Sequence, residues 1–281
     1  ADPGGQTDRP MTVRAAGVGL FDGKSASVAI EKVSGGSVLV VNGKGGALSE
    51  WSRAPAFRTT AITHPSGARL ACVEHLFAAL AAFGAHENIS IKVAGEELPI
   101  LDGASAAWCA LLAELEITAT APHLVVARDG EVAIDNSKYL FLSTETRSEV
   151  SVEIDLHGAG SFAEALPRHA EWNGTRADFV SRIAAARTFI AEKDLAEFER
   201  VGASAHLPPE SFVVLCAEAA AVQGAPFVAD EPARHKLLDL VGDFFLWGGP
   251  PRGRVEALYP GHAKSHEAIA VALKKGILAR I

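Results

Sequence analysis

The chain has 281 residues, of which 48% are hydrophobic and 21% charged, and its formal net charge is −8 at pH 7. This composition is typical of a globular protein, is long enough for one large or two ordinary domains, and excludes a strongly basic surface for nucleic acid. Because no run of 18 apolar residues exists, we expect no membrane span, and three widely separated cysteines indicate buried thiols in a reducing, cytoplasmic compartment.

The first part of the chain predicts strands followed by helices. Residues 1–10 precede Met11 and are expected to be a tag or a disordered leader, because no apolar core follows a basic start. The elements expected next, in chain order, are short antiparallel strands within 12–41, a Gly- and Ser-rich loop or small insert at 42–57, a helix from Val73 to Ala82, a strand at 88–93 and a helix at 104–116.

The same succession restarts after a Thr- and Ala-rich linker at 118–121. The expected elements are strands at 123–127, 131–134, 138–143 and 149–156, a helix at 178–186, a Pro- and Gly-interrupted stretch at 202–226, a helix at 232–247, a strand at 252–258 and a closing helix at 264–275. Strands followed by helices in each half favour two α+β domains, which we place at 11–120 and 121–281. No clear sequence repeat relates the two halves.

One motif in the second half points to chemistry. His235 and Asp239 are four residues apart within a predicted helix, so both side chains lie on one face and can hold two corners of a metal site. Far upstream, Glu74-His75 opens an apolar, helix-like run. A third ligand with a carboxylate beside it would complete a catalytic zinc site that keeps one position open.

Each of these residues also has an ordinary structural interpretation. The helix at 232–247 could simply turn its polar residues to solvent, and His75 could be a core histidine. Asp243 could be a helix cap, Thr188 a buried hydroxyl, and His262, which follows Pro260-Gly261, a solvated turn residue. The remaining histidines are interpreted as surface or local hydrogen-bonding residues: His64, His86, His123, His157, His169, His206 and His266.

Five segments, in order, carry a family resemblance. They are Val73-Glu74-His75-Leu76, Leu98-Pro-Ile-Leu-Asp102-Gly103, Ala186-Arg187-Thr188-Phe189, Arg234-His235-Lys236-Leu-Leu-Asp239-Leu-Val-Gly242-Asp243, and Gly261-His262. With them the chain resembles the UDP-3-O-acyl-N-acetylglucosamine deacetylases, the zinc enzymes of lipid A biosynthesis. The resemblance implies two similar α+β domains, each a β-sheet with helices, whose helices pack together between the two sheets with the metal at the domain interface. The second domain would then carry most of the metal site.

The resemblance also implies roles for individual residues. His75, His235 and Asp239 would hold Zn²⁺, Glu74 would be the general base, His262 its charged partner, Asp243 the residue that orients His262, and Thr188 the hydrogen-bond donor to the oxyanion. Lys236 would face the substrate, with Phe189 and Phe21 as further substrate contacts. The partner would be a small N-acylated molecule, an amino sugar or a nucleotide sugar.

Several substrate-side positions depart from the family pattern. Phe21 stands where the family has a histidine, Ile190 where it has a glycine, and 205–210, with Pro208-Pro209, where it has a glycine-rich turn. Prolines fix φ and remove N–H donors, so this loop cannot follow the same path. Three hypotheses follow: a divergent form of the deacetylase itself, a related zinc deacetylase whose substrate has a short or absent lipid chain, or a non-catalytic descendant that binds a ligand.

Overall fold

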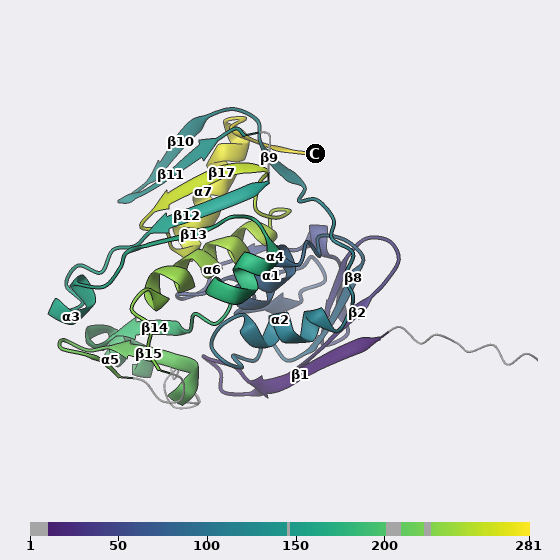
Figure 1. Cartoon of the computed structure of the whole chain (residues 1–281). Coiled ribbons are helices and arrows are strands. Elements are labelled where there is room, and N and C mark those ends of the chain that lie inside the picture. Colours follow the sequence, from purple (N-terminus) through teal and green to yellow (C-terminus); the bar gives the residue numbers. More distant parts are fainter. Residues whose placement is uncertain (1–10, 145–146, 201–208, 222–225) are drawn as a thin grey trace, which may run out of the picture.

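Two five-stranded sheets of the same topology form opposite sides of the molecule (Figure 1). The computed structural model describes residues 11–144, 147–200, 209–221 and 226–281. The first sheet has the order β1 (Thr12–Val18), β2 (Ser25–Lys32), β8 (Ile89–Ala94), β3 (Val38–Val41) and β4 (Lys44–Ala47). Its strands pair antiparallel except β3 with β8, which pair parallel.

The second sheet repeats this pattern. Its order is β10 (Gly130–Ile134), β11 (Ser137–Leu142), β17 (Gly253–Leu258), β12 (Ser148–Glu153) and β13 (His169–Trp172). Again the only parallel pair among these strands is formed by the third and fourth in the order, β17 with β12. Alternating burial along strands such as β2 and β11 turns one side of each sheet towards the core.

Helices fill the space between the sheets (Figure 1). They are α1 (Glu74–Ala82), α2 (Ala106–Ala113), α6 (Glu231–Phe245) and α7 (His262–Lys274). Every residue of α1 is buried, as expected for a helix that is apolar on nearly all sides. α1 packs along α6, and Gly242 of α6 permits this, because a Cβ at that position would lie 2.1 Å from the carbonyl oxygen of Glu74.

Smaller elements connect these layers. β5 (Ser52–Ala54), β6 (Ala61–Thr63) and β7 (Arg69–Leu70) form one three-stranded sheet, and β14 (Thr188–Ala191), β15 (Phe212–Leu215) and β16 (Ala220–Ala221) form another. β9 (Leu124–Val126) pairs with β18 (Leu278–Arg280). The remaining segments are short: the helices α3 (Ser161–Glu164), α4 (Arg176–Asp178) and α5 (Leu195–Arg200), a π-helical turn at Phe179–Ile183, and 3₁₀ turns at Leu48–Glu50, Glu192–Asp194 and Pro209–Ser211.

The predicted α+β class is confirmed, while the domain boundary at residue 120 stays a prediction. One expectation about local structure was wrong, and the bounds of another differ from the structure. The stretch 42–57 contains β4 and β5, because a glycine-rich edge strand pairs through its backbone alone; at Gly45, with φ +141°, a Cβ would lie 2.2 Å from the Leu39 carbonyl oxygen. The helix expected at 178–186 is present with other bounds: a short α-helical turn begins at Arg176, widens into a π turn and ends at Ile183.

Some predictions cannot be compared with the structure. Residues 1–10, and 205–208 of the altered loop, lie outside the described residues. Within the described ranges, no helix combines the length and the apolar character that crossing a membrane requires.

Candidate functional site

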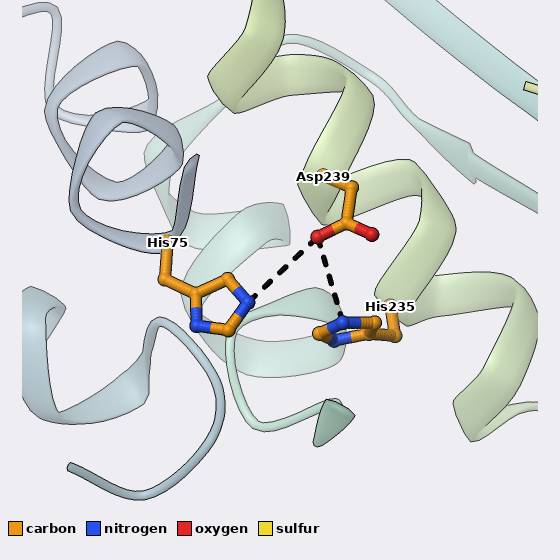
Figure 2. A group of neighbouring side chains, drawn as sticks. All are labelled: His75, His235 and Asp239. Carbon is orange, nitrogen blue, oxygen red and sulfur yellow. Dashed lines mark ion pairs between the residues drawn. The ribbon is translucent and has the colours of Figure 1, made fainter. Parts of the chain in front are cut away.

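Two histidines and an aspartate from two helices meet between the sheets (Figure 2). His75 is the second residue of α1, and His235 and Asp239 lie one turn apart on α6. Asp239 Oδ1 is 3.7 Å from His75 Nε2 and 3.5 Å from His235 Nε2. One ligand atom from each residue lies within 4.8 Å of the other two, so the three side chains enclose a space of the size of a metal site.

The chemistry of this cluster fits a divalent metal ion. Asp239 Oδ1 is buried and accepts no hydrogen bond from the described residues, whereas Oδ2 accepts one from Lys236 Nζ at 2.6 Å. A buried oxygen without a donor is costly unless another group binds it. Two imidazoles and one carboxylate are a known ligand set of catalytic zinc, which leaves a further position open.

The histidines are held in the form that binds metal. His235 Nδ1 lies 3.0 Å from the Ala186 carbonyl oxygen, which can only accept, so Nδ1 carries the proton and Nε2 keeps its lone pair. Burial and the neighbouring His235 lower the pKa of His75 to about 3. Burial also lowers the pKa of His235. Both rings are therefore neutral at physiological pH.

Glu74 lies beside this cluster at the start of α1. Its Oε1 accepts from the Thr59 hydroxyl at 2.5 Å and its Oε2 from the Thr60 backbone N–H at 3.1 Å. Burial raises the pKa of Glu74 to about 7, with Asp239 adding to the effect and His262 opposing it. A carboxylate with such a pKa both takes up and releases a proton near neutral pH.

A charged histidine, His262, lies close to Glu74. His262 begins α7, and its Nε2 lies 3.8 Å from Glu74 Oε1 and 3.6 Å from Asp239 Oδ2. Its Nδ1 donates to Asp243 Oδ1 at 3.0 Å. Burial opposes a charge on His262, but the carboxylates of Asp243, Asp239 and Glu74 outweigh burial and raise its pKa to about 9. His262 is thus a buried cation and not a solvated turn residue.

Nine of the ten candidate residues line one cavity of about 480 Å³, and Asp243 stands behind His262. Thr188 donates its hydroxyl proton to the Gly103 carbonyl at 2.9 Å. Lys236 lies over the Phe189 ring, with Nζ 5.7 Å from its centroid. Glu97 Oε1 accepts a hydrogen bond from the backbone N–H of Phe21 at 3.0 Å and so holds the loop that carries Phe21. The geometry brings the candidates together, and their roles stay predictions.

Sequence reasoning missed several residues that shape the site. Thr59 and Thr60 bind Glu74, but adjacent threonines in a loop give no distinctive signal. Glu231 binds Arg187 through Oε1 at 2.8 Å and so fixes the strand that presents Thr188. His266 and His86 were expected to be surface or local hydrogen-bonding residues; both are buried, at 1% and 8% exposed, and His266 bonds to Trp247. The four-residue spacing between His262 and His266 would have placed both side chains on the same helix face.

The fold and the site define a class: an α+β protein with two sheets of like topology and a buried His-His-Asp cluster between them. The family model described as UDP-3-O-acyl N-acetylglycosamine deacetylase matches residues 9–274. The chain belongs to this family.

Relatives named UDP-3-O-acyl-N-acetylglucosamine deacetylase support the assignment. The protein from Myxococcus xanthus is 31% identical over 205 residues, which cover 72% of this chain and 64% of the relative. The protein from Psychrobacter cryohalolentis is 30% identical over 201 residues, 70% of this chain and 61% of the relative. The protein from Shewanella loihica is 29% identical over 270 residues, 93% of this chain and 87% of the relative. The match thus spans less than two thirds of the first two relatives.

Proposed function

We propose that this protein is a zinc-dependent amide hydrolase that removes the N-acetyl group from a UDP-linked, 3-O-acylated amino sugar. The observation that carries the proposal is the pairing of Glu74 and His262 beside the His-His-Asp cluster. A carboxylate with a pKa near 7 and an imidazolium lie 3.8 Å apart next to one buried set of metal ligands. Amide hydrolysis needs a base for water and an acid for the leaving amine, and these two groups supply both.

His75, His235 and Asp239 would hold the zinc ion. When bound there, zinc supplies a Lewis acid that polarises the amide carbonyl and makes water more acidic. The chain itself orients the ligands. The Ala186 carbonyl fixes the His235 ring, and Lys236 occupies the outer oxygen of Asp239, so that Oδ1 remains directed at the two imidazoles.

Glu74 takes the proton from the attacking water. The carboxylate cannot rotate freely, because the Thr59 hydroxyl and the Thr60 N–H each bind one of its oxygens. This orientation leaves the side of Glu74 that faces His262 and the cavity for proton transfer. General-base catalysis of this kind contributes about 10²–10⁴ in rate.

His262 balances the negative charge that develops on the amide oxygen and gives a proton to the departing amine. Asp243 accepts from its Nδ1 and so turns Nε2 towards the cluster. Thr188 would add a hydrogen bond to the oxyanion by exchanging the Gly103 carbonyl for the substrate oxygen. Donors directed at a developing oxyanion are among the strongest contributors to catalysis.

The test is acetate release by the zinc-loaded protein from UDP-3-O-acyl-N-acetylglucosamine, with Glu74→Gln as the matched variant. We expect turnover by the parent and a loss of about 10²–10⁴ in the variant, with zinc content unchanged. A zinc-loaded parent that releases no acetate from acylated UDP-sugars of any chain length would contradict the proposal and favour the ligand-binding alternative.

One observation favours a second candidate, the same hydrolysis on a substrate with a short 3-O-acyl chain or none. The apolar recess beside Thr188 measures only about 20 Å³, room for little more than one water molecule. Ile190, Leu195 and Phe198 are among the side chains that line it. Phe198 also packs against Phe21, with ring centroids 6.2 Å apart, so one departure from the family pattern, Ile190, lines the recess and the other, Phe21, packs against a residue that lines it.

A side-by-side assay of a long-acyl substrate and its short-acyl analogue separates the two candidates. Burial of one CH₂ is worth about 0.8 kcal/mol, so lost contact with five methylenes lowers kcat/KM for the long-acyl substrate about a thousandfold. Phe198→Ala opens the recess and should raise the ratio of long-acyl to short-acyl turnover. Val228→Ala, at a side chain that is 52% exposed, is the control. Preference of the parent for the long chain by orders of magnitude would eliminate the second candidate.

A further inference from the structure

Two histidines of α7 approach the same carboxylate. His262 and His266 are four residues apart and therefore share a helix face. His262 Nδ1 lies 3.0 Å from Asp243 Oδ1, and His266 Nε2 lies 3.4 Å from the same oxygen. Only His262 lines the cavity, whereas His266 is 1% exposed and lies behind the proposed catalytic residues. The arrangement therefore needs something that distinguishes the two rings.

Trp247 makes this distinction. Its indole Nε1 donates to His266 Nδ1 at 2.9 Å. An indole N–H can only donate, so His266 Nδ1 must accept, and the proton of the neutral ring is on Nε2. A proton on Nδ1 would place two N–H groups against each other at hydrogen-bond distance. Trp247 thus fixes the tautomer of a buried histidine that does not itself line the cavity.

Thr60 transmits the tautomer to Asp243. Its Oγ1 donates to Asp243 Oδ1 at 2.5 Å and lies 3.0 Å from His266 Nε2. A threonine hydroxyl has one proton, so Thr60 gives this proton to Asp243 and accepts from the His266 Nε2–H. If His266 carried its proton on Nδ1 instead, its Nε2 lone pair would face Thr60. The hydroxyl would then turn from Asp243 to His266.

We propose that Trp247 and His266 are positioning residues, which hold the Thr60 hydroxyl on Asp243 and thereby fix the carboxylate that orients His262. Donors from Thr60 and His262 converge on Asp243, and Trp247 sets the direction of the whole chain of hydrogen bonds. The catalytic part of this inference rests on the proposed function, because it matters for turnover only if His262 acts in the reaction. The hydrogen-bond part stands by itself.

The test compares Trp247→Phe with Trp51→Phe. Phenylalanine keeps most of the packing at position 247 and removes the N–H donor. Trp51 is a matched control, because its buried Nε1 has no hydrogen-bond partner among the described residues. Nitrogen NMR of selectively labelled histidine reads the His266 tautomer, and the Nδ1–H proton resonance reads the hydrogen bond of His262. Steady-state kinetics and zinc content are measured on the same samples.

We expect the Nε2–H tautomer of His266 in the parent and in Trp51→Phe, and a mixture of tautomers with a shifted His262 Nδ1–H resonance in Trp247→Phe. Its kcat should fall about tenfold at unchanged KM and zinc content, the loss expected for one hydrogen bond to a charged group. His266→Gln, whose amide nitrogen can still donate to Thr60, should retain more of kcat than His266→Leu.

An Nδ1–H tautomer in the parent, or a Trp247→Phe protein with the His262 resonance of the parent, would overturn the inference. An inactive parent would instead count against the proposed function alone, because both NMR measurements are made without turnover.

Discussion

Replacing Gly242 with alanine should damage the site without replacing any of the proposed catalytic residues or metal ligands. Gly242 lies on α6 between Asp239 and Asp243, at the point where α6 crosses the start of α1. A Cβ at Gly242 would lie 2.1 Å from the carbonyl oxygen of Glu74, 2.8 Å from its carbonyl carbon and 3.0 Å from its Cα. All three atoms belong to the backbone, so no side chain can rotate away to relieve the contact.

The size of the effect follows from these distances. Ordinary contacts of a Cβ begin near 3.4 Å, so the α1 backbone must move by more than 1 Å away from α6. Overpacking of a core typically costs about 1–3 kcal/mol of unfolding free energy. The displacement falls on Glu74 and His75 together, and a misplacement of 1 Å in a catalytic site can lower the rate about 10²-fold.

Chemical denaturation, zinc content and kcat/KM of Gly242→Ala measure these effects. Gly36→Ala is the control, because a Cβ at Gly36 has no atom within 4 Å and its φ is not positive. We expect the control to change the unfolding free energy by less than about 0.5 kcal/mol. A Gly242→Ala protein with the stability and kcat/KM of the parent would show that the helix contact does not set the position of Glu74.

Three further predictions concern single side chains. His235→Ala should lose its zinc by elemental analysis, because two ligands are too few, whereas exposed His169→Ala should keep it; a fully loaded His235 variant would refute the ligand assignment. Glu74→Gln should keep both zinc and fold while losing most turnover. Burial opposes the charge on Glu231, but hydrogen bonds from Arg187 lower the pKa of Glu231 below its ordinary value of 4.5. The pair therefore stabilises the fold above pH 4.5, and this stabilisation is lost as the pH falls through the lowered pKa. Glu231→Gln should therefore be less stable than the parent by about 3–5 kcal/mol near neutral pH, a gap that closes on acidification; a gap independent of pH in denaturant titrations would contradict it.

The fold was predictable where a pattern repeats over several turns or strands. The apolar period of 73–82 predicted α1, and the alternation in 12–41 predicted strands of the first sheet. The likeness of the two sheets was predicted only through the family resemblance and by no repeat in the sequence, because a sheet fixes strand order through backbone hydrogen bonds and leaves side chains free to differ between the halves. Gly45 illustrates the same point, since its strand carries no side-chain signal at all.

The part of the candidate site that depends on the spacing of residues close together in the sequence was predictable. His235 and Asp239 are one helical turn apart, and Glu74 adjoins His75, so both pairs can be recognised from the sequence alone. Contacts between distant segments are not. The bond from Thr60 to Asp243 joins residues 183 positions apart, and it depends on a loop meeting α6 in a way that no local pattern records.

The cavity is lined by two groups of elements, the large helices on one side and a small core of short elements on the other. This division explains how its chemistry and its substrate preference can change separately. The proposed metal ligands, the base and the charged histidine are all presented by α1, α6 and α7, which are packed between the large sheets. Phe21, Ile190 and Phe198 come from a loop, from β14 and from α5, which pack in a separate small core. We therefore expect substitutions in that small core to reshape the recess beside Thr188 without moving the helices. The packed helices can therefore preserve one reaction while the loop and short elements of the small core would select the acyl chain of the proposed substrate.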